Sequence, residues 1–162
     1  VGNTPGTDLA LREDKVKGYK HFANKLWNIT RFVLENTAYA AMNDIDHSRL
    51  LARDTELLEQ FDALAQDVTA DLDEYRVYLA AEKLYHYVWH EFADKILEES
   101  KPILNGTDEA TKASRQALLL TLLDASLKLL HPFMPFVTEE IYQSMPTKNH
   151  EYLMIADWPV KK

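Results

Sequence analysis

Apolar residues recur every three or four positions along most of the chain, which is the spacing of helices that bury one face. Glycine and proline, the residues that most often interrupt helices, are absent from Tyr19 through Lys101. No segment alternates apolar and polar residues between hairpin turns, as paired strands would require. The pattern therefore predicts an all-α fold, an antiparallel bundle of four to five helices that forms one domain over residues 1–162.

The spacing predicts five helices, at about 13–42, 54–72, 79–99, 107–130 and 136–144. We expect the first helix to bury Phe22, Leu26, Ile29, Val33 and Ala40. The next three helices should bury, in chain order, Leu57, Phe61, Leu64, Val68 and Leu72, then Leu84, Val88, Phe92 and Ile96, then Leu118, Leu122, Leu123, Leu127 and Leu130.

Local signals mark several ends of these helices. Lys101-Pro102 should end the third helix, because proline disfavours helical backbone at the residue before it. Thr107 is expected to cap the fourth helix, with Asp108 and Glu109 in the first turn. The apolar tail over 150–160 should be extended and should pack back on the bundle.

The composition narrows the class of protein. The chain has no cysteine, which excludes a disulfide scaffold, a thiolate zinc site and an iron–sulfur cluster. No apolar run approaches the roughly 18 residues of a membrane-spanning helix, and the N-terminal sequence lacks the pattern of a secretory signal. We therefore expect a soluble cytoplasmic protein without a membrane partner.

Charge is unevenly distributed along the chain, whose net charge is −8. Residues 12–31 hold six basic and two acidic residues, a net of +4, which leaves −12 for the rest. A basic segment on an acidic body is typical of an anion-binding face, although a solvated helix face with incidental lysines fits the same pattern. The overall acidity taken alone argues weakly against nucleic acid.

The polar side of the predicted first helix carries cations, amides and aromatic rings. Recognition of single-stranded RNA uses such a set, because cations hold phosphates, amides read base edges and aromatic rings stack on unpaired bases. The candidate nucleic-acid contacts are Lys17, Lys20, Asn24, Lys25, Trp27, Asn28, Arg31 and Phe32. Trp27 and Phe32 also fit core positions, and the two asparagines also fit hydrogen bonds between helices.

Other candidate sites are weaker. His86 and His90 stand at i and i+4 and could share a metal, but no third ligand is evident nearby and an ordinary exposed pair fits better. Glu139 and Glu140 are adjacent and so do not face each other on a helix, where a place near its N-terminus explains them. We predict no metal site and no catalytic site in this chain.

Four segments spread along the chain form a recognisable set. They are Phe22–Leu34, the pair Ala80–Tyr85 and Val88–Asp94, Leu130–Ile141, and Asp157–Pro159. In this order they resemble the anticodon-binding domain of the valyl-tRNA synthetases, which belong to the class I aminoacyl-tRNA synthetases. The run Asn24-Lys25-Leu26-Trp27-Asn28 favours the valine type over its isoleucine and leucine relatives.

The resemblance implies a domain that binds the anticodon stem-loop of valine tRNA, with Phe32 as first candidate for stacking on an anticodon base and Trp27 as second. It also implies a parent valine–tRNA ligase that uses ATP and Mg²⁺ and that supplies a catalytic domain and a C-terminal coiled coil as further partners. The HIGH and KMSKS signatures of that catalytic domain are absent. We therefore expect a piece of the larger enzyme, with no cofactor of its own.

Three alternatives remain open at this point. One is a helical protein-interaction module without RNA affinity, which would use the exposed flank of the bundle or the tail around Trp158. Another is the same domain from an isoleucine- or leucine-type synthetase. The third is a metal-dependent enzyme built on His86 and His90.

Overall fold

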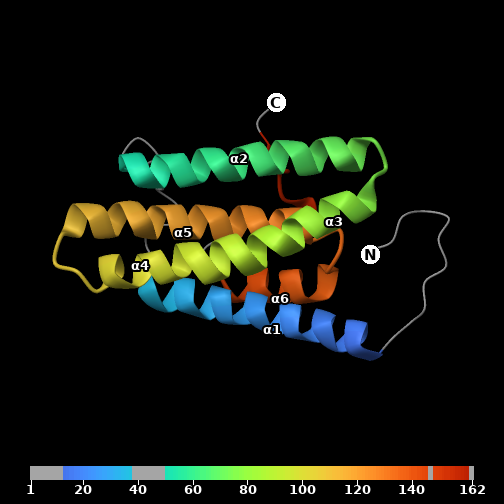
Figure 1. Cartoon of the computed structure of the whole chain (residues 1–162), viewed down its shortest axis with the longest axis horizontal. Coiled ribbons are helices and arrows are strands. Elements are labelled where there is room, and N and C mark those ends of the chain that lie inside the picture. The colour runs from blue at the N-terminus through green and yellow to red at the C-terminus, as the bar shows by residue number, and fades with distance from the viewer. Residues whose placement is uncertain (1–12, 38–49, 146–147, 161–162) are drawn as a thin grey trace.

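The protein is a helical bundle (Figure 1). The computed structural model describes residues 13–37, 50–145 and 148–160, and of residues 14–16 the backbone alone. Its helices are α1 (Glu13–Asn36), α2 (Ala52–Asp73), α3 (Val77–His86), the π-helix η3 (Tyr87–Ile96), α4 (Leu97–Leu104), α5 (Glu109–Leu130), α6 (Pro135–Ser144) and the 3₁₀-helix η4 (Leu153–Ile155). These ranges contain no strand, so the predicted all-α bundle is confirmed. No helix in them is long and apolar enough to cross a membrane.

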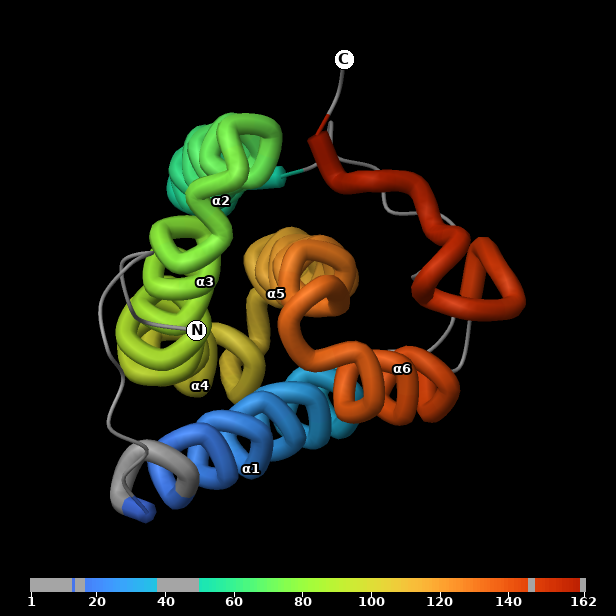
Figure 2. Tube along the Cα trace, turned by 90° about the vertical axis from the view of Figure 1, so that its right-hand side faces the viewer, coloured from blue at the N-terminus to red at the C-terminus, as the bar shows by residue number. Residues whose placement is uncertain are grey.

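α5 lies at the centre of the bundle, with α2 on one side, α1 on the opposite side, and α3 and α6 flanking it (Figure 2). Most outer helices have one apolar face, but α5 carries leucines all round, as suits a helix that is covered on every side. Its buried leucines are Leu118, Leu119, Leu120, Leu122, Leu123, Leu127, Leu129 and Leu130. The hydrophobic core of the protein is therefore organised around this one helix.

The predicted apolar stripes face inward in nearly every case. Phe22, Leu26, Ile29 and Val33 of α1 are buried, as are all the residues predicted for the third and fourth helices. In α2, Leu64 and Leu72 are only half-buried, and Ala65 takes a core position between its neighbours. Ala40 lies outside the described residues.

The third predicted helix is longer and wider than expected. α3, η3 and α4 follow one another without a break from Val77 to Leu104, so the prediction that Lys101-Pro102 ends the helix is wrong. Pro102 removes one donor, but the N–H of Asn105 still donates to the carbonyl of Lys101 at 3.1 Å and closes the last turn. In the π-helix, hydrogen bonds span five residues instead of four. This wide turn suits a buried face whose members stand four apart: Leu84, Val88, Phe92 and Ile96.

Asp108, not Thr107, caps α5. Its carboxylate accepts hydrogen bonds from the hydroxyl of Thr111 at 2.6 Å and from the N–H of Ala110 at 3.1 Å. These bonds, the Thr111 hydroxyl foremost, hold the pKa of the Asp108 carboxyl below its ordinary value. Both residue types are common caps, so the sequence alone did not distinguish them.

The end of the first helix and the conformation of the C-terminal tail also differ from the prediction. α1 ends at Asn36, and the predicted continuation through residue 42 lies almost entirely outside the described residues. The C-terminal tail is not extended throughout, because it includes η4. It does pack back on the bundle: Leu153 is buried, and the indole N–H of Trp158 donates to the Thr69 hydroxyl of α2 at 2.8 Å.

A buried group of ionic and polar side chains joins α2, α4 and α5. Arg115 is 1% exposed, and its Nε lies 2.7 Å from Oδ1 of Asp54, a carboxylate in a residue that is 3% exposed. The other guanidinium nitrogens donate to Ser100 at 3.1 Å and to Glu99 at 2.9 Å, while Ser114 donates to the second oxygen of Asp54 at 2.5 Å. Since the buried charges have partners, neither is left isolated in the core.

The turn between α2 and α3 is closed without glycine. Tyr75 adopts a φ of 60°, in the left-handed region that costs a non-glycine residue roughly 1–2 kcal/mol. The buried carboxylate of Asp71 lies 2.6 Å from Lys83 and 2.8 Å from Arg76 across the turn. The hydrogen bond from Lys83, more than that from Arg76, lowers the pKa of the Asp71 carboxyl. The ion pairs thus hold α2 and α3 together at a strained connection.

We predict that Arg115→Met destabilises the fold by about 3–5 kcal/mol, because it leaves the Asp54 charge buried without its partner. Urea unfolding followed by circular dichroism measures this. Arg53→Met is the matched control: Arg53 pairs with Glu56 and Glu99 at the surface, so its loss should cost less than about 1 kcal/mol. Equal losses for the two variants would contradict the assignment.

Tyr75→Gly should raise the free energy of unfolding by about 1 kcal/mol, because glycine adopts a positive φ without the steric cost. Tyr75→Ala is the control that removes the ring and keeps Cβ, and it should give no such gain. The same unfolding assay applies. If alanine stabilises as much as glycine, the ring and not the backbone is responsible.

Candidate nucleic-acid interface

α1 turns one side to the core and the other to solvent. Phe22, Leu26, Ile29 and Val33 are at most 3% exposed and pack in the cluster around α5. The side chains on the opposite side are exposed. We call six of them the α1 outer face: Lys17, Lys20, Asn24, Trp27, Asn28 and Arg31.

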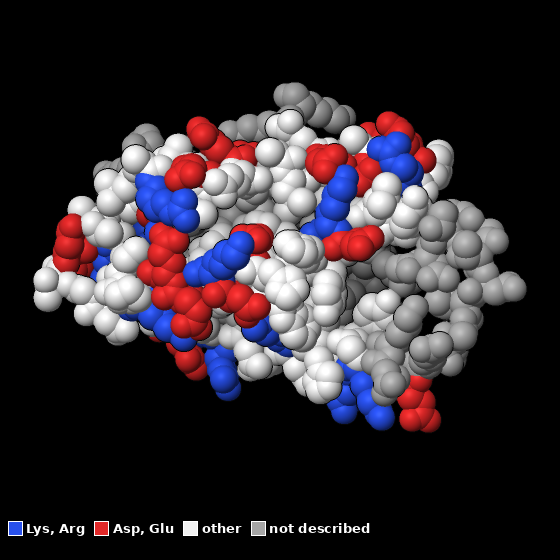
Figure 3. All heavy atoms as spheres, viewed as in Figure 1, with Lys and Arg blue, Asp and Glu red and all other residues white. Residues whose placement is uncertain are grey.

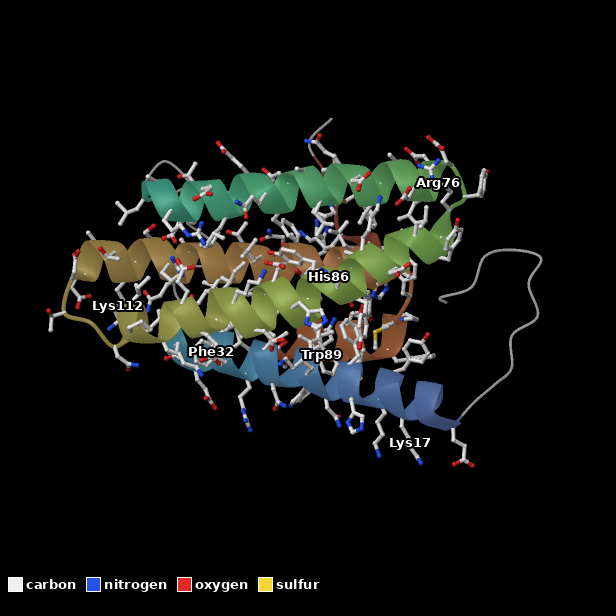
Figure 4. All side chains as sticks on the ribbon, in the orientation of Figure 1. Lys17, Phe32, Arg76, His86, Trp89 and Lys112 are labelled. Carbon is white, nitrogen blue, oxygen red and sulfur yellow. The ribbon has the colours of Figure 1, made fainter. Side chains whose placement is uncertain are left out.

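The α1 outer face combines positive charge, amides and an aromatic ring on one ridge. Lys17 points away from the bundle along the edge that α1 forms (Figure 4). In the surface view, basic side chains project from this lower edge, whereas many acidic side chains gather above it (Figure 3). Trp27 is 44% exposed, so the interpretation of Trp27 as a core residue is not supported. The ridge can therefore offer a ring face and several donors to one ligand.

The two asparagines of the ridge are exposed, and no hydrogen bond from their side chains to another helix occurs among the described residues. The interpretation that Asn24 and Asn28 fix helices against each other therefore has no support there. Their amides remain available to a ligand as both donors and acceptors.

Lys25 and Phe32, the other two predicted residues, lie on the flank of α1 and are half-buried. Phe32 packs against the hydrophobic core, so only part of its ring is accessible. Lys25 turns toward η3, where its Nζ lies 2.8 Å from Oδ1 of Asp94 and 5.4 Å from the centre of the Trp89 ring. The eight predicted residues thus divide into six on the outer face and two beside it.

The partners of Lys25 come from a helix that the sequence did not connect with α1. Trp89 stacks on Tyr85 with ring centres 5.6 Å apart and on Phe22 of α1 at 6.3 Å. Trp89 and Asp94 are five residues apart, the spacing of hydrogen-bonded residues in a π-helix, so the wide turn of η3 presents both on one side. Their only signal in the sequence was membership of the segment Val88–Asp94.

The ion pair alters the titration of Asp94. The hydrogen bond from the Lys25 ammonium lowers the pKa of the Asp94 carboxyl, and His90, whose Nδ1 lies 3.5 Å from Oδ2, adds a smaller contribution in the same direction. Asp94 is therefore a carboxylate over the whole neutral range. Among the α1 cations whose side chains are described, Lys25 alone has its charge balanced from another element.

The remaining candidates are the histidine pair of α3 and η3 and the two glutamates of α6. The rings of His86 and His90 have centres 5.0 Å apart, but the described residues hold no group of three or more histidine and acidic side chains able to bind a metal. Glu139 accepts hydrogen bonds from the N–H of Leu153 and from Gln143, which is a structural use.

Comparison with known proteins identifies the domain. Residues 54–162 match the family described as the anticodon-binding domain of tRNA ligase. The chain belongs to this family. It is also 42% identical to the valine–tRNA ligase of Carboxydothermus hydrogenoformans, and 38% identical to those of Clostridium perfringens and Bacillus anthracis. These alignments cover 98% of this chain, α1 included, but only 18% of the length of each relative.

Lys25→Met should raise the pKa of the Asp94 carboxyl toward its ordinary value, because it removes the main group that stabilises the carboxylate. A carbon-detected NMR titration of side-chain carboxyls measures the change. Stability that depends on this depressed pKa is present above about pH 4 and is lost as the pH falls through the folded-state pKa.

Lys20→Met removes an equal charge from the same helix and should leave the pKa of Asp94 nearly unchanged, since Lys20 makes no ion pair with a described residue. An identical titration of Asp94 in wild type and Lys25→Met would show that the pair does not persist in solution.

Proposed function

We propose that this chain is the anticodon-binding part of a valine–tRNA ligase and that its α1 outer face, together with Lys25 and Phe32 on the flank of α1, binds the anticodon stem-loop of valine tRNA. The family match and the names of the relatives support the anticodon-binding role. The observation that supports this position of the binding site is the exposed α1 outer face, which presents three cations, two amides and Trp27 on a chain that is otherwise acidic.

The chemistry of RNA suggests a role for each residue of the proposed interface. Lys17, Lys20, Lys25 and Arg31 would hold phosphates, because ammonium and guanidinium groups neutralise the backbone and fix its register. Asn24 and Asn28 would read base edges, since an amide can donate and accept at once.

Stacking of an anticodon base has two candidates. Phe32 remains the first, and its anchorage in the core would fix the orientation of its ring. Trp27 is the second, and 44% of its surface is already exposed to solvent. Each would contribute about 1–3 kcal/mol if a base stacks on it.

The charge distribution predicts modest affinity for the isolated chain. α2, on the far side of α5, exposes five acidic residues and one basic residue, so RNA that reaches beyond the α1 side of the bundle meets repulsion. With two to four phosphates neutralised, at about 0.7 per phosphate, the logarithm of the binding constant should fall with the logarithm of salt concentration with a slope of about −1.4 to −2.8.

The whole protein would join valine to its tRNA with ATP and Mg²⁺, and this chain would contribute binding while a catalytic domain performs the chemistry. Among the described residues there is no group of three or more histidine and acidic side chains that could hold a metal ion, so none of them is assigned to Mg²⁺. A catalytic domain and a C-terminal coiled coil would be its neighbours in the parent protein.

A protein-interaction module is the second candidate function, because some apolar side chains are unusually exposed. Phe136 at the start of α6 is 90% exposed and Met154 in η4 is 74% exposed. The tail is less available than the sequence suggested, since Trp158 is hydrogen-bonded to α2. Salt-independent binding of a protein through Phe136 would favour this candidate.

The test is a fluorescence titration of this chain with a labelled anticodon stem-loop of valine tRNA, at several salt concentrations. A loop with its central anticodon base changed is measured beside it. We expect salt-sensitive binding that discriminates between the loops. Equal binding to both would reduce the proposal to a phosphate platform, and absence of binding at low salt would contradict it.

The two aromatic candidates can then be separated. Whichever ring stacks on a base, its replacement by alanine should weaken binding of the valine loop by about fivefold or more. Lys20→Gln should instead weaken the binding of both loops equally. It should also reduce the magnitude of the slope of the binding constant against salt by about 0.7, because it removes one phosphate contact.

Lys112→Gln on α5 is the charge control and should leave both loops bound as in wild type. Thermal unfolding of Phe32→Ala distinguishes a lost contact from a loosened core.

A further inference from the structure

Lys25 differs from the other cations of the proposed interface because its charge is already neutralised inside the protein. Its ammonium is 2.8 Å from Asp94, and the two side chains are 31% and 45% exposed. Among the described residues, in contrast, Lys17 pairs only with Glu13 of its own helix at 3.8 Å, and neither Lys20 nor Arg31 has an ion-pair partner. A phosphate that approaches Lys25 therefore meets a carboxylate beside the cation.

We propose that Asp94 competes with RNA phosphate for Lys25, so that the domain gives up an internal ion pair whenever RNA engages this lysine, and the bound RNA leaves sooner. The inference rests on the proposed function, since it concerns the same interface. It assigns to Asp94 the role of setting how tightly and for how long RNA is held.

The direction of the effect follows from what would hold Lys25 if Asp94 lost its charge. Nζ also lies 5.4 Å from the centre of the Trp89 ring, a cation–π distance. Trp89 is itself fixed by its stacks with Tyr85 and Phe22. The ammonium would therefore stay at the boundary of α1 and η3, unpaired and ready for a phosphate, instead of moving freely in solvent.

The competition acts on affinity and lifetime rather than on discrimination. Every RNA that binds Lys25 breaks the same ion pair of the protein and meets the same repulsion from Asp94. An RNA that contacts only the α1 outer face leaves the ion pair intact. Because the cost is paid in the bound complex, it should appear mainly as faster dissociation. Rapid exchange suits a protein that must release each tRNA after use.

The test compares Asp94→Asn with Glu91→Gln in binding and dissociation of the valine stem-loop at low salt. Both variants remove one negative charge from η3, but Glu91 pairs with Lys95 at 2.7 Å and not with α1. We expect Asp94→Asn to tighten binding about three- to tenfold, mostly through slower dissociation, and Glu91→Gln to change it less than about twofold. The gain should shrink as salt rises.

Repeating the comparison in the Lys25→Met variant tests whether Asp94 affects RNA binding through Lys25. If Asp94 acts through Lys25, Asp94→Asn should give no more than the Glu91→Gln effect once the lysine is absent. A gain that survives in this background, or an Asp94→Asn variant that binds no better than Glu91→Gln, would overturn the inference while leaving the proposed function intact.

Absence of stem-loop binding by wild type and by every variant would overturn both. Thermal unfolding of each variant verifies that the bundle is retained, which is expected because this exposed ion pair contributes little to stability.

Discussion

The pairing of Arg115 with Asp54 is the constraint on which the arrangement of the helices depends. Arg115 is 1% exposed, and its buried guanidinium is stable only while it is hydrogen-bonded to Asp54 and Ser100. These bonds keep α2 and α4 packed against α5. The next residue, Gln116, donates to the carbonyl of Asn36 at 2.8 Å and so ties the end of α1 to the same part of α5. The rotation of α1, and with it the side that faces solvent, follows from this central helix.

The inward-facing residues could be predicted from the sequence because burial repeats with the helix period. The burial of Phe22, Leu26, Ile29 and Val33 can be predicted without knowing which helix covers them. The cap of α5 and the end of the third helix were predicted wrongly because the local sequence allows two outcomes at each. Thr107 and Asp108 are both good caps, and the helix continues past Pro102 because the turn around it closes through other hydrogen bonds. The wide turn of η3 has no local signal of comparable strength.

The same distinction applies to the candidate interface. Its outer face lies on one helix, so the spacing of Lys17, Lys20, Asn24 and Arg31 was sufficient to group them. The environment of Lys25 depends on Asp94, which is 69 positions away in the chain, and a single sequence does not reveal a contact between helices. The flank of α1 is therefore the part of the interface that required the structure, and it is also where the cation with an internal partner lies.

The positions of α1 and α2 on opposite sides of α5 give the molecule an electric dipole across the bundle (Figure 2). Basic side chains line the α1 side, whereas α2 exposes five acidic residues and one basic residue. Near a polyanion such a dipole experiences a torque that turns α1 toward the ligand before any contact forms. The net charge of −8 opposes association as a whole, but the dipole makes the encounter selective for the orientation in which α1 faces the ligand.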